Sequence, residues 1–321
     1  KYISPLDFSA ENKYKLSFYS EDNDSNIEDI KNYEFQIDKT SPTTSVDISG
    51  TGGENGWYKS DVGITLSAVD SLSGINKTKY SIDDGQTYIN YNGVVNFPNE
   101  GVSKFKYYST DKAGNIENAH SVDWKIDKTA PSTVVYTTGI RGQTGWYRTD
   151  VEIAFNGKDD VSGLQKTLYS LDNGQSYHDY VDPLVFKDEG YSKIIYYSID
   201  NAGNEETKNT IEFNIDKTPP IVTINATPNS IWPPNGKMID VKVMGNIDEK
   251  NLYSKTFKVI DEYGLVQPSL ADFNQTIKLQ ADRNGTDKDS RIYQIQAKAE
   301  DFAGNISNVS TNVIVPHDQG K

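Results

Sequence analysis

The chain has 321 residues, and its 32 lysines and arginines against 46 aspartates and glutamates give a formal net charge of −14. Such an acidic chain repels phosphate backbones and anionic lipid, which argues against nucleic acid and membrane surfaces as partners. It has no cysteine, which excludes disulfides and thiolate zinc sites, and no apolar stretch long enough for insertion into a membrane. Its 21 tyrosines, 11 phenylalanines and 4 tryptophans indicate a folded chain, since disordered chains are poor in aromatic residues.

An internal repeat governs the organisation of the chain. The string Ile-Asp-Lys-Thr occurs at 37–40, 126–129 and 215–218, at intervals of 89 residues. Other landmarks recur at the same interval without insertion or deletion, among them Trp57-Tyr58 with Trp146-Tyr147, and Ala113-Gly114-Asn115 with Ala202-Gly203-Asn204. The interval predicts two complete repeats, at 41–129 and 130–218.

Residues 1–40 fit the second half of the same repeat. Three of their aromatic residues lie 89 positions before aromatic residues of the first complete repeat: Phe8 before Phe97, Phe18 before Tyr107, and Phe35 before Trp124. Half a sandwich leaves unpaired strand edges and an apolar face exposed, here with Phe8, Leu16, Phe18, Tyr33 and Phe35. Each such side chain is worth about 1.5–3 kcal/mol when buried, so we expect another chain or segment to complete residues 1–40 by strand addition.

Each complete repeat has the pattern of a β-sandwich. Apolar residues alternate with polar ones at Ile64, Leu66 and Ala68, which is the period of a half-buried strand. Turn residues such as Asp83-Asp84-Gly85 separate the predicted strands, and no window shows helical spacing. About seven short strands per repeat predict an immunoglobulin-like sandwich. We expect an all-β chain of tandem immunoglobulin-like β-sandwich domains arranged as an elongated rod.

The last unit, 219–321, is longer and differs in sequence. Ile239, Val241 and Val243 alternate with polar residues, and Asp301 to Asn305 repeats the Asp-x-Ala-Gly-Asn string. We expect a divergent immunoglobulin-like terminal domain.

Several motifs resemble the bacterial immunoglobulin-like repeats of exported proteins. They are Gly56-Trp57-Tyr58, Ser60-Asp61-Val62, Tyr80-Ser81-Ile82-Asp83, Tyr107-Tyr108-Ser109, Asp-x-Ala-Gly-Asn and Ile-Asp-Lys-Thr-x-Pro. The terminal unit is similar to another bacterial module through its motifs at 232–235, 282–289, 301–305 and 315–320. Such repeats occur in tandem in surface proteins and behind the catalytic domains of secreted hydrolases. The resemblance therefore implies a sandwich fold and a location outside the cell.

Catalytic motifs leave little trace in the sequence. The histidines His120, His178 and His317 form no metal-ligand pair. The repeat has Asn209 at the position equivalent to His120 and Ile89 at the position equivalent to His178, so neither histidine belongs to a repeated site. The chain has no nucleophile elbow and no phosphate-binding loop that opens a helix. We expect no enzymatic activity and no catalytic residue.

Acidic residues recur in the loops predicted to meet at one end of each sandwich, where the linker from the preceding domain also arrives. The three sets are Asp38, Asp70 and Asp111 with Asn115; Asp127, Asp159 and Asp200 with Asn204; and Asp216, Asp248 and Asp301 with Asn305. Calcium prefers six to eight oxygen ligands from flexible loops, so the pattern predicts calcium as a cofactor at the domain junctions. The alternative is purely structural, because Asp and Asn also build turns.

Two aromatic pairs, Trp57-Tyr58 and Trp146-Tyr147, recur at the start of a strand. Packing of these rings against the sandwich core is one interpretation, and stacking on a carbohydrate is the other.

These observations favour a non-catalytic spacer or adhesive module of a bacterial surface or secreted protein. The alternative is an accessory carbohydrate-binding region of a secreted hydrolase. An extracellular or cell-surface location follows from the resemblance and the lack of cysteine. The predicted partners are a surface glycan, or another chain that completes residues 1–40.

Overall fold

A computed structural model describes residues 1–265, 267–286 and 288–317 of the chain. All 24 regular elements in these ranges are β-strands, which confirms the predicted all-β class. None of the described residues forms a helix that is long and apolar enough to cross a membrane. The predicted terminal motifs at 282–289 and 315–320 lie partly outside the described residues.

The contacts group the chain into two compact units. The first unit comprises Lys1–Thr133, Gly157–Thr167 and Tyr197–Thr207. The second unit comprises Val134–Asn156, Leu168–Tyr196 and Lys208–Lys321, of which 266, 287 and 318–321 are not described.

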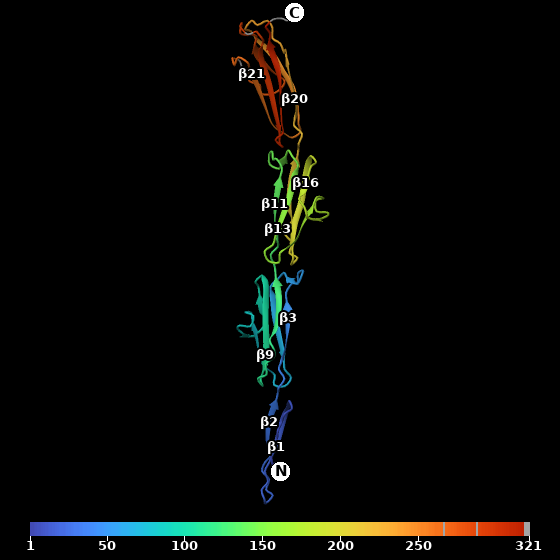
Figure 1. Ribbon diagram of the computed structural model, residues 1–321, viewed down its shortest axis with the longest axis vertical. Coiled ribbons are helices and arrows are strands. Elements are labelled where there is room, and N and C mark those ends of the chain that lie inside the picture. The colour runs from blue at the N-terminus through green and yellow to red at the C-terminus, as the bar shows by residue number, and fades with distance from the viewer. Residues whose placement is uncertain (266, 287, 318–321) are drawn as a thin grey trace. The chain divides into compact units, whose positions relative to one another are not determined.

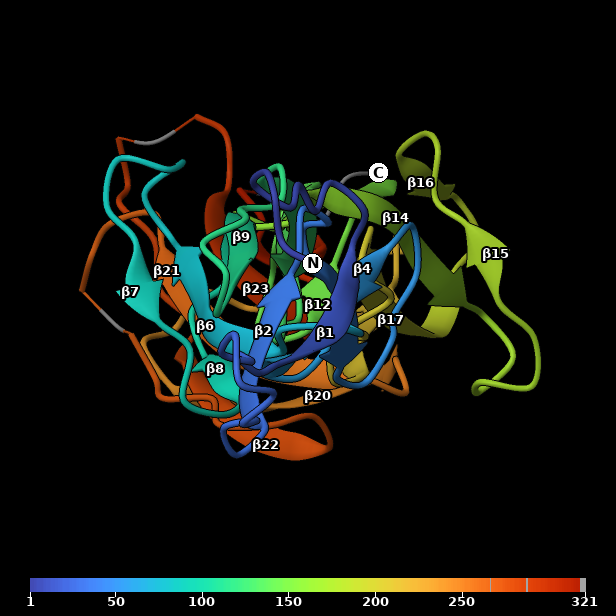
Figure 2. The ribbon, with the colours of Figure 1, turned by 90° about the horizontal axis from the view of Figure 1, so that it is seen from below.

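The N-terminal segment forms a single antiparallel hairpin. Its strands are β1 (Asn12–Phe18) and β2 (Lys31–Ile37), and Asn12 lies opposite Ile37. Figure 1 and Figure 2 show this hairpin as two blue arrows. The two strands form a sheet of their own.

Eight strands follow in the first complete repeat. They are β3 (Thr43–Ser49), β4 (Trp57–Tyr58), β5 (Val62–Val69), β6 (Ile75–Ser81), β7 (Ile89–Asn90), β8 (Val95–Phe97), β9 (Gly101–Asp111) and β10 (His120–Ile126). They form one sheet in the order β4-β10-β9-β6-β7 and a second in the order β3-β5-β8.

The second repeat has the same eight strands in the same two sheets. They are β11 (Ser132–Thr138), β12 (Trp146–Tyr147), β13 (Val151–Lys158), β14 (Leu164–Ser170), β15 (His178–Asp179), β16 (Leu184–Phe186), β17 (Gly190–Asp200) and β18 (Asn209–Ile215). The sheet orders are β12-β18-β17-β14-β15 and β11-β13-β16.

Strand alternation explains where the core lies. In β5, Val62, Ile64 and Leu66 point inward and are buried, and they pack on Phe105 and Trp124 of the opposite sheet. The same positions in the second repeat are occupied by residues of a second buried cluster. The core of each repeat therefore lies between its two sheets, as in an immunoglobulin-like sandwich.

The terminal domain is also built from two sheets. Its strands are β19 (Ile221–Thr227), β20 (Met238–Asp248), β21 (Leu252–Asp261), β22 (Gln275–Gln280), β23 (Arg291–Asp301) and β24 (Ile306–Val315). The orders are β19-β20-β22 and β21-β23-β24. A fully buried ion pair joins Arg291 to Asp261, with Nη2 2.6 Å from Oδ2.

Candidate metal centres and the loops around them

Three clusters of carboxylates lie in loops at the start of the sandwich domains. In each cluster, the three carboxylates have oxygen atoms that lie within 4.8 Å of one another. The clusters are Asp38, Asp70 and Asp111; Asp127, Asp159 and Asp200; and Asp216, Glu249 and Asp301. Eight of these nine residues are the ones that the sequence predicted.

Strand ends position the first cluster. Asp38 follows β2, Asp70 follows β5 and Asp111 is the last residue of β9. Backbone N–H groups fix the side chains: Ser73 donates to Asp38 at 2.9 Å and Gly74 donates to Asp70 at 2.6 Å. The second cluster repeats these bonds 89 residues later.

An asparagine amide ties each linker to the loop of the domain that follows. The Nδ2 atom of Asn115 donates to the backbone oxygen of Asp38 at 3.1 Å and to Oδ2 of Asp111 at 2.7 Å. Asn204 and Asn305 make the equivalent bonds in the other two clusters. The final residue of the Asp-x-Ala-Gly-Asn string thus fastens the linker to the turn.

The third cluster differs from the prediction in one residue. Asp248 is the exposed last residue of β20, and Glu249 lies in the cluster instead. Strand alternation explains the change, because neighbouring residues point to opposite faces and a shift of one position exchanges them. Val241, Val243 and Ile247 are apolar at odd positions, and this alternation was the sequence signal that Glu249, rather than Asp248, faces the same side.

The half repeat keeps the same turn in spite of its different sequence. Oδ1 of Asp22 accepts hydrogen bonds from the backbone N–H groups of Asp24 and Asn26, and Nδ2 of Asn26 donates to Oδ2 of Asp22. Asp22 therefore occupies the position that Asp111 occupies in the complete repeat.

The pKa values of the aspartates are shifted in opposite directions in the first and third clusters. Hydrogen bonds from Ser73 lower the pKa of Asp38. Burial acts to raise the pKa of Asp111, but hydrogen bonds from Asn115 and Gly114 outweigh it, so this pKa is also lowered. Burial raises the pKa of Asp216, and the charges of Asp301 and Glu189 add to the effect.

The donor set fits a hard divalent cation. Within the described part of the chain, none of the nine carboxylates forms an ion pair with Lys or Arg. Ionised carboxylates have about four acceptor positions each. Backbone donors take only Oδ1 of Asp70 and of Asp159, which leaves each Oδ2 for another ligand. Convergent carboxylate oxygens of this kind suit calcium.

A second repeated feature lies at the other end of the first repeat, in the loop before β4. In the first unit, the backbone N–H of Glu54 donates to the carbonyl of Ala202 at 2.9 Å. Nζ of Lys59 donates to the carbonyl of Gly203, also at 2.9 Å. The loop thus binds the backbone of the turn that begins at Asp200.

The second unit contains a similar contact, in which the loop residues 89 positions later bind the turn that begins at Asp301. The backbone N–H of Gln143 donates to the carbonyl of Phe302 at 2.7 Å, and Nη1 of Arg148 donates to that of Gly304 at 2.8 Å. We refer to 51–59 and 140–148 as the docking loops. The sequence analysis did not find this contact, although Lys59 recurs as Arg148 at the same interval.

Close approach explains a glycine in each docking loop. A Cβ atom on Gly53 would lie 2.3 Å from the carbonyl oxygen of Ala202, and one on Gly142 would lie 2.3 Å from that of Phe302. A Cβ atom on Gly52 would meet no other atom within 4 Å, so close approach does not require glycine at that position.

The aromatic pairs divide between core and loop. Tyr147 is buried in the core of its sandwich, and Tyr58 packs against the core of the first repeat. Trp146 is half-buried with its ring 6.0 Å from that of Phe302, and Trp57 lies under Nζ of Lys125 at 5.0 Å. Carbohydrate stacking at these four residues stays a prediction.

Sequence reasoning also missed a buried polar network. Glu117 is 7% exposed and accepts hydrogen bonds from the backbone of Thr44 at 3.0 Å and of Ser109 at 2.6 Å. Glu206 repeats these contacts in the second sandwich. The network ties the first strand of each repeat to β9 or β17, so we assign it a structural role.

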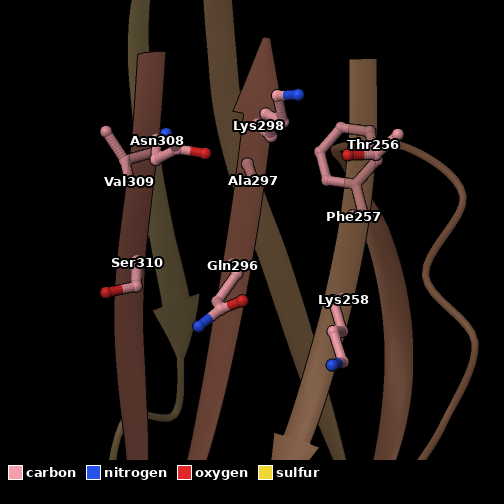
Figure 3. A pocket seen from close by; sticks show the side chains of 9 residues that line it. All are labelled: Thr256, Phe257, Lys258, Gln296, Ala297, Lys298, Asn308, Val309 and Ser310. Carbon is pink, nitrogen blue, oxygen red and sulfur yellow. The ribbon is translucent and has the colours of Figure 1, made fainter. Parts of the chain in front are cut away.

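A shallow depression crosses β21, β23 and β24 of the terminal domain (Figure 3). It is lined by Thr256, Phe257, Lys258, Gln296, Ala297, Lys298, Asn308, Val309 and Ser310. The lining contains two lysines but no carboxylate or histidine, so it offers no acid–base pair for catalysis.

Comparisons with known proteins add little about function. No family model matches the chain, and no curated protein matches it. Fibronectin(III)-like modules of Clostridium thermocellum CbhA show 13% identity over 54% of this chain and 94% of theirs, with a TM-score of 0.29. A tetra-tandem repeat from the extending region of a large adhesion protein shows 12% identity over 96% and 82%, with a TM-score of 0.32. Extracellular cadherin domains 3–6 of protocadherin gamma B2 show 11% identity over 95% and 84%, with a TM-score of 0.34.

Sequence identities and TM-scores this low support no assignment of function. The tandem all-β organisation expected from the sequence motifs is confirmed by the strands and sheets described above.

Proposed function

We propose that this chain is a non-catalytic spacer or adhesive module in which the junctions between successive domains are held in a fixed direction. The observation that carries the proposal is the recurrence of the same junction contacts 89 residues apart. Asn115 and Asn204 fasten a linker to a loop in the same way, and Gly53 and Gly142 each allow a docking loop to approach the backbone of a turn closely. A repeat that only had to fold would not need matching contacts to its neighbour.

Calcium at the three carboxylate clusters is part of the proposal. Each cluster joins a linker residue to two loops of the next domain, so a bound cation would hold the linker against both loops. Removing the cation leaves three carboxylates close together, whose repulsion favours opening of the junction. Weak calcium sites are typical of extracellular modules, which bind in the range of about 10⁻⁴–10⁻³ M.

An extracellular or cell-surface location completes the proposal. It is supported by the resemblance of the motifs to exported bacterial repeats and by the absence of cysteine.

The test is NMR relaxation of backbone amides in the intact chain. We expect the residues of 41–129 and those of 130–218 to report one common rotational diffusion tensor in millimolar calcium. Addition of a chelator should shorten their correlation times and make the two repeats tumble separately. Independent tumbling of the two repeats in calcium would contradict a spacer with fixed junctions.

A further inference from the structure

The hairpin of β1 and β2 exposes an aromatic face. The rings of Phe8, Tyr14 and Phe35 pack on one another, with centroids 4.9–5.2 Å apart. Tyr33 extends the group and is 62% exposed, and Phe18 is 47% exposed. Soluble domains seldom leave contiguous apolar surface uncovered unless it binds something.

The first complete repeat shows what covers the same face when it is buried. The residues 89 positions after Leu16, Phe18 and Phe35 are Phe105, Tyr107 and Trp124, which are 0%, 6% and 3% exposed. These rings are covered by Val62, Ile64 and Leu66, the inward residues of β5. The hairpin has no such strand opposite it in the described part of the chain.

The edges of the hairpin also lack the neighbouring strands that the first complete repeat has, within the described part of the chain. In the first repeat, β9 pairs with β6 along one edge, and β10 pairs with β4 along its other edge. Among the described residues, their equivalents β1 and β2 pair only with each other (Figure 1). Strand β9 runs over 11 residues, whereas β1 runs over 7 and ends where its counterpart begins to pair along β6.

We propose that the hairpin β1–β2 is a docking site for a polypeptide segment with the pattern of β3 to β6. A strand with alternating valine, isoleucine and leucine would cover the aromatic face, as β5 does. A second strand would pair with residues 17–22, which are equivalent to the part of β9 that pairs with β6. The backbone hydrogen bonds would provide affinity and the alternate apolar side chains would provide specificity.

The turn at Asp22 extends the proposed surface. It already has the hydrogen-bonded geometry of the Asp111 turn, but among the described residues it belongs to no cluster of three carboxylates. The occupant would bring the loop that follows a β5-type strand, where Asp70 and Asp159 stand in the complete repeats.

The test uses the intact chain and a synthetic peptide of its own residues 41–90 as the probe. Hydrogen exchange is measured on the amides of 14–20 and 33–37 with and without the peptide. The control peptide carries V62D, I64D and L66D, which remove the alternating apolar residues. We expect the wild-type peptide to slow exchange in both segments at least tenfold, and the control peptide to leave exchange unchanged.

Three results would overturn the proposal. The first is strong protection of both segments in the monomeric chain without any peptide, which would show that the hairpin is stable uncovered. The second is protection that increases with chain concentration alone, which would show that a second copy covers the face. The third is equal protection by both peptides, or by neither.

Discussion

The carboxylate of Asp216 behaves differently from that of Asp38, although the two lie at equivalent positions of the repeat. Hydrogen bonds hold the pKa of Asp38 below its ordinary value, whereas burial raises that of Asp216. In the third cluster, the longer Glu249 stands where the other two clusters have an aspartate. The same position therefore favours the charged form in one junction and the neutral form in another.

Replacement by asparagine should therefore have opposite effects at the two positions. An aspartate whose pKa is raised in the folded state stabilises the fold fully only at a pH below its ordinary pKa. This contribution is lost as the pH rises through the pKa of the folded state. In chelator at pH 7, D216N should raise the melting temperature, because it removes a disfavoured charge. A lowered pKa stabilises the fold above the ordinary value and loses this contribution as the pH falls, so D38N should lower the melting temperature.

Calorimetry at pH 7 and at pH 4 measures both effects. Addition of calcium should raise the melting temperature less in both variants than in the unsubstituted chain, since each variant lacks one cation ligand. A lower melting temperature of D216N in chelator would contradict the assigned electrostatics of the third cluster.

Single elements show which features a sequence can reveal. Alternation predicted β5 and β20 because each has one face in the core. The 89-residue interval predicted the first two carboxylate clusters, because equivalent loops of equivalent sandwiches meet at the same place. It could not place Glu249, because the terminal domain departs from the interval and its strand register was unknown.

The docking loops could not be found in this way. The contact of Asn55 with the backbone of Asn201 joins residues 146 positions apart, and it recognises carbonyl groups that every residue carries. No pattern of side chains marks a backbone surface, so the glycines of the docking loops did not reveal what these loops contact. The buried pair of Arg291 and Asp261 was hidden for a related reason, since both residue types are usually exposed.

We expect two neighbouring substitutions in the docking loop of the first unit to affect its contact with Ala202 unequally. G53A forces a methyl group onto the carbonyl oxygen of Ala202 and should cost about 1–3 kcal/mol of docking free energy. The amide of Glu54, which donates to that carbonyl, should lose its protection from hydrogen exchange. G52A is the matched control, because its methyl group meets no atom within 4 Å.

Equal protection of the Glu54 amide in G53A and G52A would show that the contact does not form in solution. The corresponding pair in the second unit is G142A with the amide of Gln143, which donates to Phe302.

At the scale of the whole molecule, we expect the three carboxylate clusters to act as separate calcium sites, one at each junction. Each cluster combines one residue of a linker with two residues of the domain that follows, and none contains a positive charge. Binding of a ligand to the folded state alone stabilises that state by mass action. Calcium should therefore act on every junction, and the loss of one cluster should leave the others intact.

Calorimetric titration of the chelator-treated chain with calcium tests this claim most directly. We expect binding at millimolar calcium or below with a stoichiometry of three. D70N and D159N should each reduce the stoichiometry by one, because each removes the carboxylate with a free Oδ2. D47N, at an exposed position of β3 that belongs to none of the clusters, should leave it unchanged. Absence of binding heat at millimolar calcium, or a stoichiometry of three in D70N and D159N, would contradict the account.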